Sequence, residues 1–178
     1  LSGRLAGRYR DQGGYMDNLV RNSEEPEVES MGLRGSLLFD ASDALQIYGK
    51  VEYAEVDRSG ANGQLTDING NFRGILQHKD AISPLEDARF DQKNSSNSFS
   101  PEGAKLDSFS TTVQIDWDVG ENTLVSLTNY SEYDTESVLD GDFSDLLFIE
   151  QRPVEEFEQF SQEFRFASPG GEVLDYIV

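Results

Sequence analysis

The links between strand-like segments constrain this chain most, because they alternate regularly between long and short. Within each segment, apolar and polar residues alternate, which is typical of β-strands that expose two different faces. The long links span residues 11–29, 57–105 and 134–158, and the short ones span 40–44, 118–122 and 167–171. Successive links of an up-and-down meander fall at opposite ends of the sheet. The pattern therefore predicts tight turns at one end and long loops at the other.

The alternation predicts about seven strands and no helix. The strand-like segments are 1–10, 30–39, 45–56, 106–117, 123–133 and 159–166, and a seventh begins at residue 172. Pro84 interrupts the one stretch with some helical spacing, residues 75–90. Each strand that enters a short link carries an aromatic residue near its end, on the apolar face: Phe39, Trp117 and Phe166. We expect these three rings at one height on one wall, as in the interfacial girdle of a membrane barrel.

Composition limits the class of partner. The 178 residues include 34 acidic and 14 basic side chains, a net charge of −20, and phosphate contacts need Lys and Arg on the binding face, so nucleic acid is not an expected partner. The absence of cysteine excludes disulfides and thiolate metal sites. No apolar run approaches the roughly 20 residues of a membrane helix. A membrane β-barrel stays compatible with this composition, because half of each strand faces a polar lumen.

Loop asymmetry and the aromatic pattern favour a piece of an outer-membrane barrel over a soluble fold. Such barrels have short periplasmic turns, long external loops and an even number of strands from eight upward. The chain begins at Leu1 and stops within a strand-like run at Val178, so we expect further strands in a longer polypeptide. One alternative is a soluble secreted β-sandwich that acts as a lectin-like binding module. A second is a secreted glycan hydrolase with paired carboxylates such as Glu52 and Asp116.

A family resemblance appears at the sixth predicted strand. The run 159–171, QFSQEFRFASPGG, followed by Leu174-Asp175-Tyr176, resembles TonB-dependent outer-membrane receptors. Residues 32–39 continuing through 45–52, and residues 123–133, are similar to the same family. The resemblance implies that residues 1–178 are an early part of the barrel domain, within an all-β, antiparallel, 22-stranded transmembrane β-barrel closed by an N-terminal plug.

The resemblance also implies a function, location and partners. It implies uptake of a scarce small-molecule ligand across the bacterial outer membrane, driven by the TonB complex, which would act through an N-terminal part of the protein outside this sequence. The first candidate ligand is a ferric siderophore, while other family members carry cobalamin, glycans or other metals. The implied partners are outer-membrane lipid, the protein's own plug domain, the TonB complex and the ligand.

Residues with enzymatic or metal-binding patterns are scarce. His78 is the only histidine, and no P-loop, GxGxxG, HExxH or GxSxG pattern is present. The run beginning at Asp67 starts like a calcium loop but has His78 where the bidentate Glu belongs. We therefore expect a transporter rather than an enzyme, with no cofactor. Asp140, Asp142 and Asp145 could together bind a hard cation through oxygen ligands, although we predict no metal site.

Two sets of residues are candidates for a role in transport. Charges on the polar face would, by the resemblance, face the plug or the water around it, and they either dock the plug through ion pairs or simply hydrate the lumen. These inner-wall candidates are Arg4, Arg8, Arg34, Lys50, Glu52, Glu163 and Arg165. The ligand-entrance candidates are Tyr130, Tyr133, Asp140 and Asp142. The tyrosines could equally anchor a membrane interface. The acidic run 134–158 could be a solvated loop or a surface that attracts cations.

Overall fold

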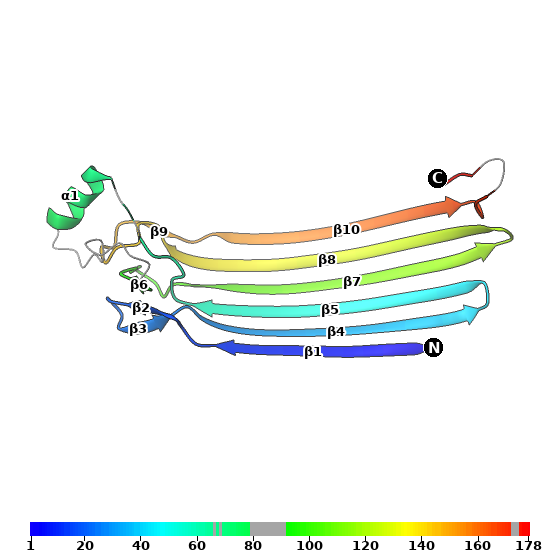
Figure 1. The fold of residues 1–178 in the computed structure, drawn as a ribbon, viewed down its shortest axis with the longest axis horizontal. Coiled ribbons are helices and arrows are strands. Elements are labelled where there is room, and N and C mark those ends of the chain that lie inside the picture. Colours follow the sequence, from blue (N-terminus) through cyan, green and yellow to red (C-terminus); the bar gives the residue numbers. More distant parts are fainter. Residues whose placement is uncertain (66, 68, 79–91, 172–174) are drawn as a thin grey trace.

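One long, open antiparallel sheet dominates the computed structural model, which describes residues 1–65, 67, 69–78, 92–171 and 175–178 (Figure 1). Its long strands follow one another in chain order, each antiparallel to the next. They are β1 (Ser2–Gln12), β4 (Glu27–Ser42), β5 (Leu45–Ser59), β7 (Gly103–Val119), β8 (Asn122–Asp140) and β10 (Val154–Ala167). The predicted all-β class and antiparallel meander are therefore confirmed over these residues, and the sheet is not closed.

The strands extend further toward the long loops than the sequence predicts. β8 continues through residues 134–140, which the sequence predicts as part of a long link, and Asp134 pairs with Asp107 there. Ladder hydrogen bonds are made by the backbone, so pairing continues where side chains become charged and the apolar alternation stops. The predicted bounds of this long link, residues 134–158, are therefore too wide, and the interpretation of the whole run as a solvated loop is wrong for the residues in β8 and β10.

The opposite end of the sheet has the predicted tight turns. Residues 43–44 link β4 to β5, and residues 120–121 link β7 to β8. Gly120 has a φ of 67° in the second turn, a backbone conformation that glycine adopts without a steric penalty. After β10 the chain turns back, and an isolated antiparallel bridge joins Ala167 to Ile177. The seventh predicted strand thus begins to pair where described, while residues 172–174 lie outside the described residues.

The strand register separates an apolar face from a charged face. We call a row of residues that pair directly across successive strands a rung. One rung on the apolar face runs from Leu5 through Val51 and Thr111 to Phe160. Trp117 and Phe166 both pair with Leu124, so they share a rung. Phe39 lies on the same face but one rung away, beside Ile47 and Ile115. The predicted common wall is confirmed, whereas the common rung holds for two of the three aromatic residues.

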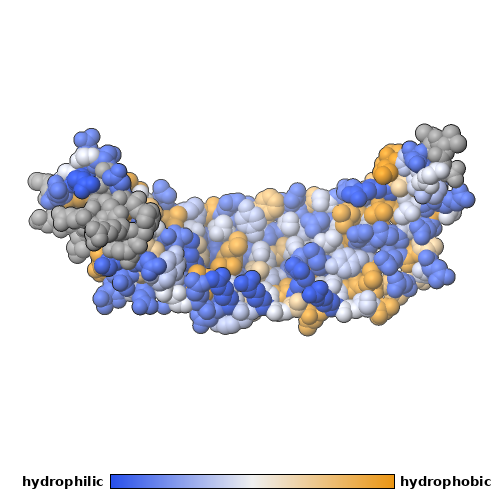
Figure 2. All heavy atoms as spheres, viewed as in Figure 1, coloured by the Kyte–Doolittle hydropathy of each residue, from blue (hydrophilic) through white to orange (hydrophobic). Residues whose placement is uncertain are grey.

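The sheet itself has no buried hydrophobic core. Among the described residues, the buried apolar side chains are Met16, Ala61 and Leu76, all of which lie outside the long strands. The largest apolar side chains of the sheet are open instead, with Leu5 84% and Phe164 67% exposed. Figure 2 shows hydrophobic and hydrophilic side chains intermixed over the long strands of a curved body.

Short elements gather with the long loops at one end of the sheet (Figure 1). The strands β2 (Met16–Asn18), β3 (Ser23–Glu25) and β6 (Lys93–Asn94) form a small sheet in the order β3-β2-β6. The strand β9 (Glu150–Gln151) pairs with the end of β8. Within the described residues, no helix has the length and apolar character needed to cross a bilayer.

The helix α1 (Gly70–His78) contradicts the prediction that no helix forms. The helix begins at Gly70, directly after Asn69. The Asn69 side chain accepts a hydrogen bond from the backbone N–H of Phe72 at 2.9 Å, which is N-cap geometry. Leu76 of this helix is buried, with 3% of its surface exposed. The described helix ends at His78, before Pro84, and residues 79–91 lie outside the described residues.

Candidate functional site

The register places all seven inner-wall candidates on one face of the sheet. Arg34 is directly opposite Glu52, and both Arg4 and Lys50 are opposite Ser36. At the other side of the sheet, Glu163 pairs with Leu127, which in turn pairs with Gln114 on the same face. The antiparallel register is continuous across these positions, and directly paired residues point to the same side of a sheet.

Some of these charges form ion pairs along and across the strands. Arg34 Nη2 lies 2.5 Å from Glu52 Oε1, and Lys50 Nζ contacts the other oxygen of the same carboxylate. On β10, Arg165 contacts Glu163 two residues away. Among the described residues, Arg4 and Arg8 on the edge strand β1 have no acidic side chain within ion-pair distance. The face therefore combines neutralised pairs with free positive charge.

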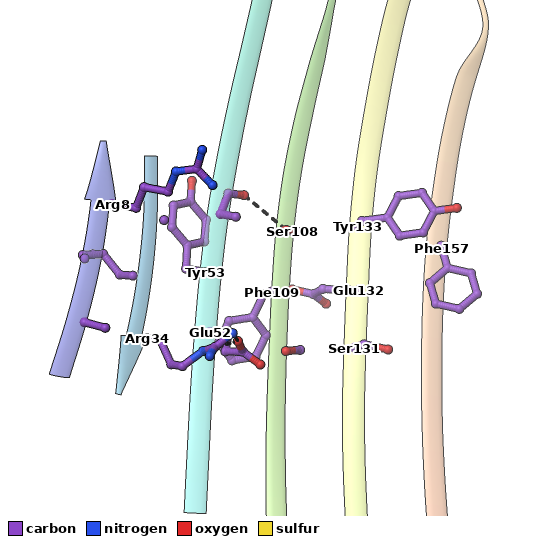
Figure 3. Close-up of a pocket in the computed structure, with 16 residues that line it drawn as sticks. Arg8, Arg34, Glu52, Tyr53, Ser108, Phe109, Ser131, Glu132, Tyr133 and Phe157 are labelled. Atoms are coloured by element: carbon purple, nitrogen blue, oxygen red, sulfur yellow. Dashed lines mark hydrogen bonds and ion pairs between the residues drawn. The ribbon is translucent and has the colours of Figure 1, made fainter. Parts of the chain in front are cut away.

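A hollow of about 540 Å³ lies on this charged face, between two rungs. Its floor consists of small side chains from four strands: Gly32, Ala54, Ser108, Ser110 and Ser131. Arg8, Arg34 and Glu52 stand at one side, and Tyr133 and Phe157 stand at the other (Figure 3). The hollow thus offers guanidinium donors, hydroxyl groups and aromatic surface to an occupant of the lumen.

The two ligand-entrance tyrosines lie on opposite faces. Tyr133 faces the hollow, where its ring stacks on Phe157 with centroids 5.0 Å apart, and its hydroxyl donates to Glu155. Tyr130 is on the apolar face, on the rung of Thr111 and Phe160. Their separation of three residues in an extended strand gives this result, since side chains alternate with a period of two.

Tyr130 belongs to a row of three tyrosines on the apolar face. Each hydroxyl donates to a carboxylate nearer the loop end: Tyr9 to Glu29 at 2.9 Å, Tyr53 to Asp107 at 3.1 Å, and Tyr130 to Glu132 at 2.5 Å. An apolar ring with a polar tip toward water is the geometry of an interfacial anchor. This placement fits the anchoring alternative better than a ligand contact.

The two acidic entrance candidates are buried inside the loop cluster. Asp140 is 3% exposed and accepts hydrogen bonds from the backbone N–H groups of Asp142 and Asn97. Asp142 accepts from the backbone N–H groups of Ser144 and Ile149. These carboxylates organise the loop and do not form an entrance surface. Over the residues that the structure describes, no group of three or more His, Cys, Asp or Glu side chains is arranged to hold a metal ion.

A buried polar network joins the three long loops, and sequence reasoning missed most of it. Arg21 lies between two carboxylates, with Arg21 Nη2 2.7 Å from Glu102 Oε1 and Arg21 Nη1 3.5 Å from Glu25 Oε1. Asn18 donates to Glu25 at 3.0 Å and to the carbonyl of Ser96 at 3.0 Å. Ser96 in turn contacts Glu102 and Asp140. The only signal in the sequence was the density of polar residues in the loops.

The carboxylate pair of the hydrolase alternative is too widely separated for glycan hydrolysis. Glu52 pairs with Ser110, and Asp116 lies six residues further along β7. At about 3.4 Å per residue this is roughly 20 Å along the strand. Hydrolases that use two carboxylates hold them about 5–9.5 Å apart. This pair therefore does not form such a site.

We compared the chain with protein-family models, with curated proteins and with solved structures, and none of them matches it.

Proposed function

We propose that this chain is part of a transmembrane β-barrel of the bacterial outer membrane and works in a TonB-dependent receptor that imports a small ligand. One observation carries the barrel proposal: an open sheet exposes its largest apolar side chains on one face and its charges on the other. Leu5 is 84% and Phe160 66% exposed on the apolar face. Contiguous apolar surface of this kind marks contact with another apolar phase, which lipid would supply.

The height of the apolar face fits a bilayer. Its apolar rungs run from Trp117 near the tight turns to Phe109, which pairs with Tyr53. Eight residues along β7 cover roughly 27 Å, and a strand tilt of about 40° reduces this to about 21 Å of height, close to the band of about 25 Å in known barrels. The next rung toward the loops is acidic and contains Glu55, Asp107, Asp134 and Glu156.

A soluble β-sandwich fits these observations less well. A sandwich buries its apolar faces against a second sheet. Leu37, Val113 and Phe164 are 61%, 40% and 67% exposed, so no other part of the described chain covers them. The edge strand β1 and most of the edge strand β10 also stay open, and further barrel strands would pair with them.

The receptor part of the proposal rests on the family resemblance and on the charged face. The long loops gather at one end of the sheet (Figure 1), and the hollow on the charged face, lined by Arg8, Ala54 and Tyr133, lies in the half of the strands nearer to them. Arg8, which has no acidic side chain within ion-pair distance among the described residues, favours an anionic occupant at its side of the hollow. A ferric siderophore with anionic donor groups suits that charge, and carboxylates of a plug domain would suit it as well.

Spin labels on adjacent residues of one strand, which point to opposite faces of the sheet, test the barrel. The chain has no cysteine, so single cysteines can be labelled without background. Nitroxides at Leu37→Cys and Val113→Cys should collide often with lipid-soluble oxygen and rarely with a water-soluble nickel chelate. The neighbouring labels at Ser36→Cys and Thr112→Cys should show the reverse. Labels at Leu37 and Val113 that neither reagent reaches would indicate a protein core and contradict the barrel.

Uptake measurements test the receptor function separately. Cells that carry the complete protein should import radiolabelled iron presented as a ferric siderophore chelate, and loss of TonB should abolish this import. A matched strain without the protein is the control. Uptake that is unaffected by loss of TonB would contradict the receptor proposal and leave the barrel proposal standing.

A further inference from the structure

The polar network between the loops contains two buried carboxyl groups that share one hydroxyl. Ser96 Oγ lies 2.9 Å from Glu102 Oε2 and 3.0 Å from Asp140 Oδ2. All three residues are buried, with exposed fractions of 0%, 4% and 3%. Glu102 belongs to the link between β5 and β7, and Asp140 ends β8. The contact therefore joins two of the three long loops.

Counting donors shows that this arrangement needs a proton. A serine hydroxyl has one hydrogen and can donate it to only one of the two carboxyl groups. If both groups are ionised, the second contact brings a negative oxygen against a lone pair of Ser96. If one group is protonated, its O–H donates to Ser96 Oγ while Ser96 donates to the other group. The second state satisfies both contacts.

The charged groups around Glu102 and Asp140 do not replace the proton that this arrangement needs. Arg21 is the cation that contacts Glu102, and it also contacts Glu25, so one guanidinium is shared by two buried carboxyl groups while Asp140 has no cation in contact among the described residues. The other described charged groups nearby come from several segments. Asp142 donates its backbone N–H to Asp140, Asp145 accepts a hydrogen bond from Asn97 through its backbone carbonyl, and the Glu150–Arg152 pair lies beside Ser100. A small hollow lined by Glu102 also contains Asp57, Arg58, Lys105 and Glu136. Asp142 adds further negative charge beside Asp140.

We propose that Glu102, Ser96 and Asp140 form a proton-operated latch, which holds the long loops together when one carboxyl group is protonated and loosens them when both are ionised. Arg21, which belongs to the first long loop, connects that loop to the latch through Glu102. The proposal concerns the opening of the loops and holds for the protein without any ligand. It goes beyond the proposed function and does not depend on it.

The pKa shifts of Glu102 and Asp140 have the direction that the latch requires. Burial raises the pKa of Glu102, against the opposing effects of Ser96 and Arg21. Burial likewise raises the pKa of Asp140, against the backbone hydrogen bonds that it accepts. The closed loops therefore bind a proton more tightly than the open loops. Closure is most stable below the pKa of the open form and weakens as the pH rises through the pKa of the closed form.

Hydrogen exchange tests the latch in the folded full chain without ligand. After correction for intrinsic exchange, peptides covering residues 94–103 and 138–145 should exchange more slowly as the pH falls from neutral, by up to about tenfold per pH unit, the limit for one proton. Peptides from the middle of β5 should show no such dependence. An absence of pH dependence in the loop peptides would overturn the proposal.

Isosteric variants test whether Glu102 and Asp140 together carry the proton. Asp140→Asn and Glu102→Gln each remove one charge, so either variant should abolish the pH dependence. Glu24→Gln is the matched control, because Glu24 is an exposed carboxylate of β3 in the same loop cluster, and it should keep the wild-type dependence. Retention of the dependence in both buried variants would overturn the proposal. If both variants open the loops at every pH, the pH dependence of exchange in the wild-type protein alone decides whether the proposal stands.

Discussion

Arg34 and Glu52 face each other across β4 and β5, and their guanidinium and carboxylate groups are 2.5 Å apart on the charged face of the sheet. The Arg34 side chain is nevertheless 60% exposed, so water screens the pair. Ion pairs of this kind contribute about 0–1 kcal/mol. Their arrangement suits contacts that form and break in an aqueous lumen.

We predict a weak coupling between these two residues. In a double-mutant cycle with Arg34→Ala and Glu52→Ala, the interaction energy should stay within about 0–1 kcal/mol, because both charges are hydrated. Urea unfolding of the detergent-folded protein measures it. A coupling of several kcal/mol would show that the lumen is dry at this point.

The single tryptophan gives a direct test of the predicted interfacial girdle of Phe39, Trp117 and Phe166. Trp117 is the only tryptophan of the chain, is 47% exposed and lies on the apolar face near the tight turns. In lipid vesicles, its fluorescence should be quenched by brominated acyl chains, most strongly by bromines close to the headgroups, since interfacial aromatics sit at that level. Quenching by aqueous iodide alone would contradict contact with lipid. Urea-unfolded protein in the same vesicles is the control.

A charge on the apolar face should be costly. Leu37→Arg should destabilise the protein folded in vesicles by about 2–4 kcal/mol, the cost of arginine near the middle of a bilayer. Ser36→Arg is the matched control, because the neighbouring residue points to the charged face, and it should change the unfolding free energy by less than about 1 kcal/mol. Equal effects of the two substitutions would argue against a lipid-facing wall.

The cap of α1 should contribute measurably to the stability of this helix. Asn69→Ala removes the acceptor for the backbone N–H of Phe72 and should destabilise the helix by about 1 kcal/mol. Hydrogen exchange of residues 70–78 should then be faster, while the long strands stay unchanged. Gln77→Ala, at an exposed position of the same helix, is the control and should leave this exchange nearly unaltered.

The attachment of β9 should respond to pH with the opposite sign to the proposed latch. The hydrogen bond from Arg152 lowers the pKa of Glu150, and Glu150 also accepts the backbone N–H of Ser100 at 2.8 Å. This contribution is fully present above the pKa of the unfolded carboxyl and is lost as the pH falls through the folded pKa. Exchange of residues 149–152 should therefore accelerate in acid. Glu150→Gln should remove that acceleration, and an unchanged pH response in this variant would contradict the assignment.

The sequence by itself determined the order of the long strands, the sides on which their residues lie, and the ends at which tight turns and long loops occur. Alternation with a period of two and the spacing of the links are local properties, so they can be read without the fold. They placed Arg8, Lys50 and Glu163 on one face, as the register confirms. They did not show the capped helix at Asn69, where the side chain bonds a backbone group three residues away.

Only the tertiary structure decided which residues meet across the sheet and between the loops. Val125 and Leu127 on β8 follow a weak pattern, and cross-strand pairing with Asp116 and Gln114 places them on the charged face. Ser96 and Asp140 are 44 residues apart in the chain yet are in contact. Such contacts depend on how three separate loops pack together. No local periodicity encodes that packing, because each side chain finds its partner on another segment.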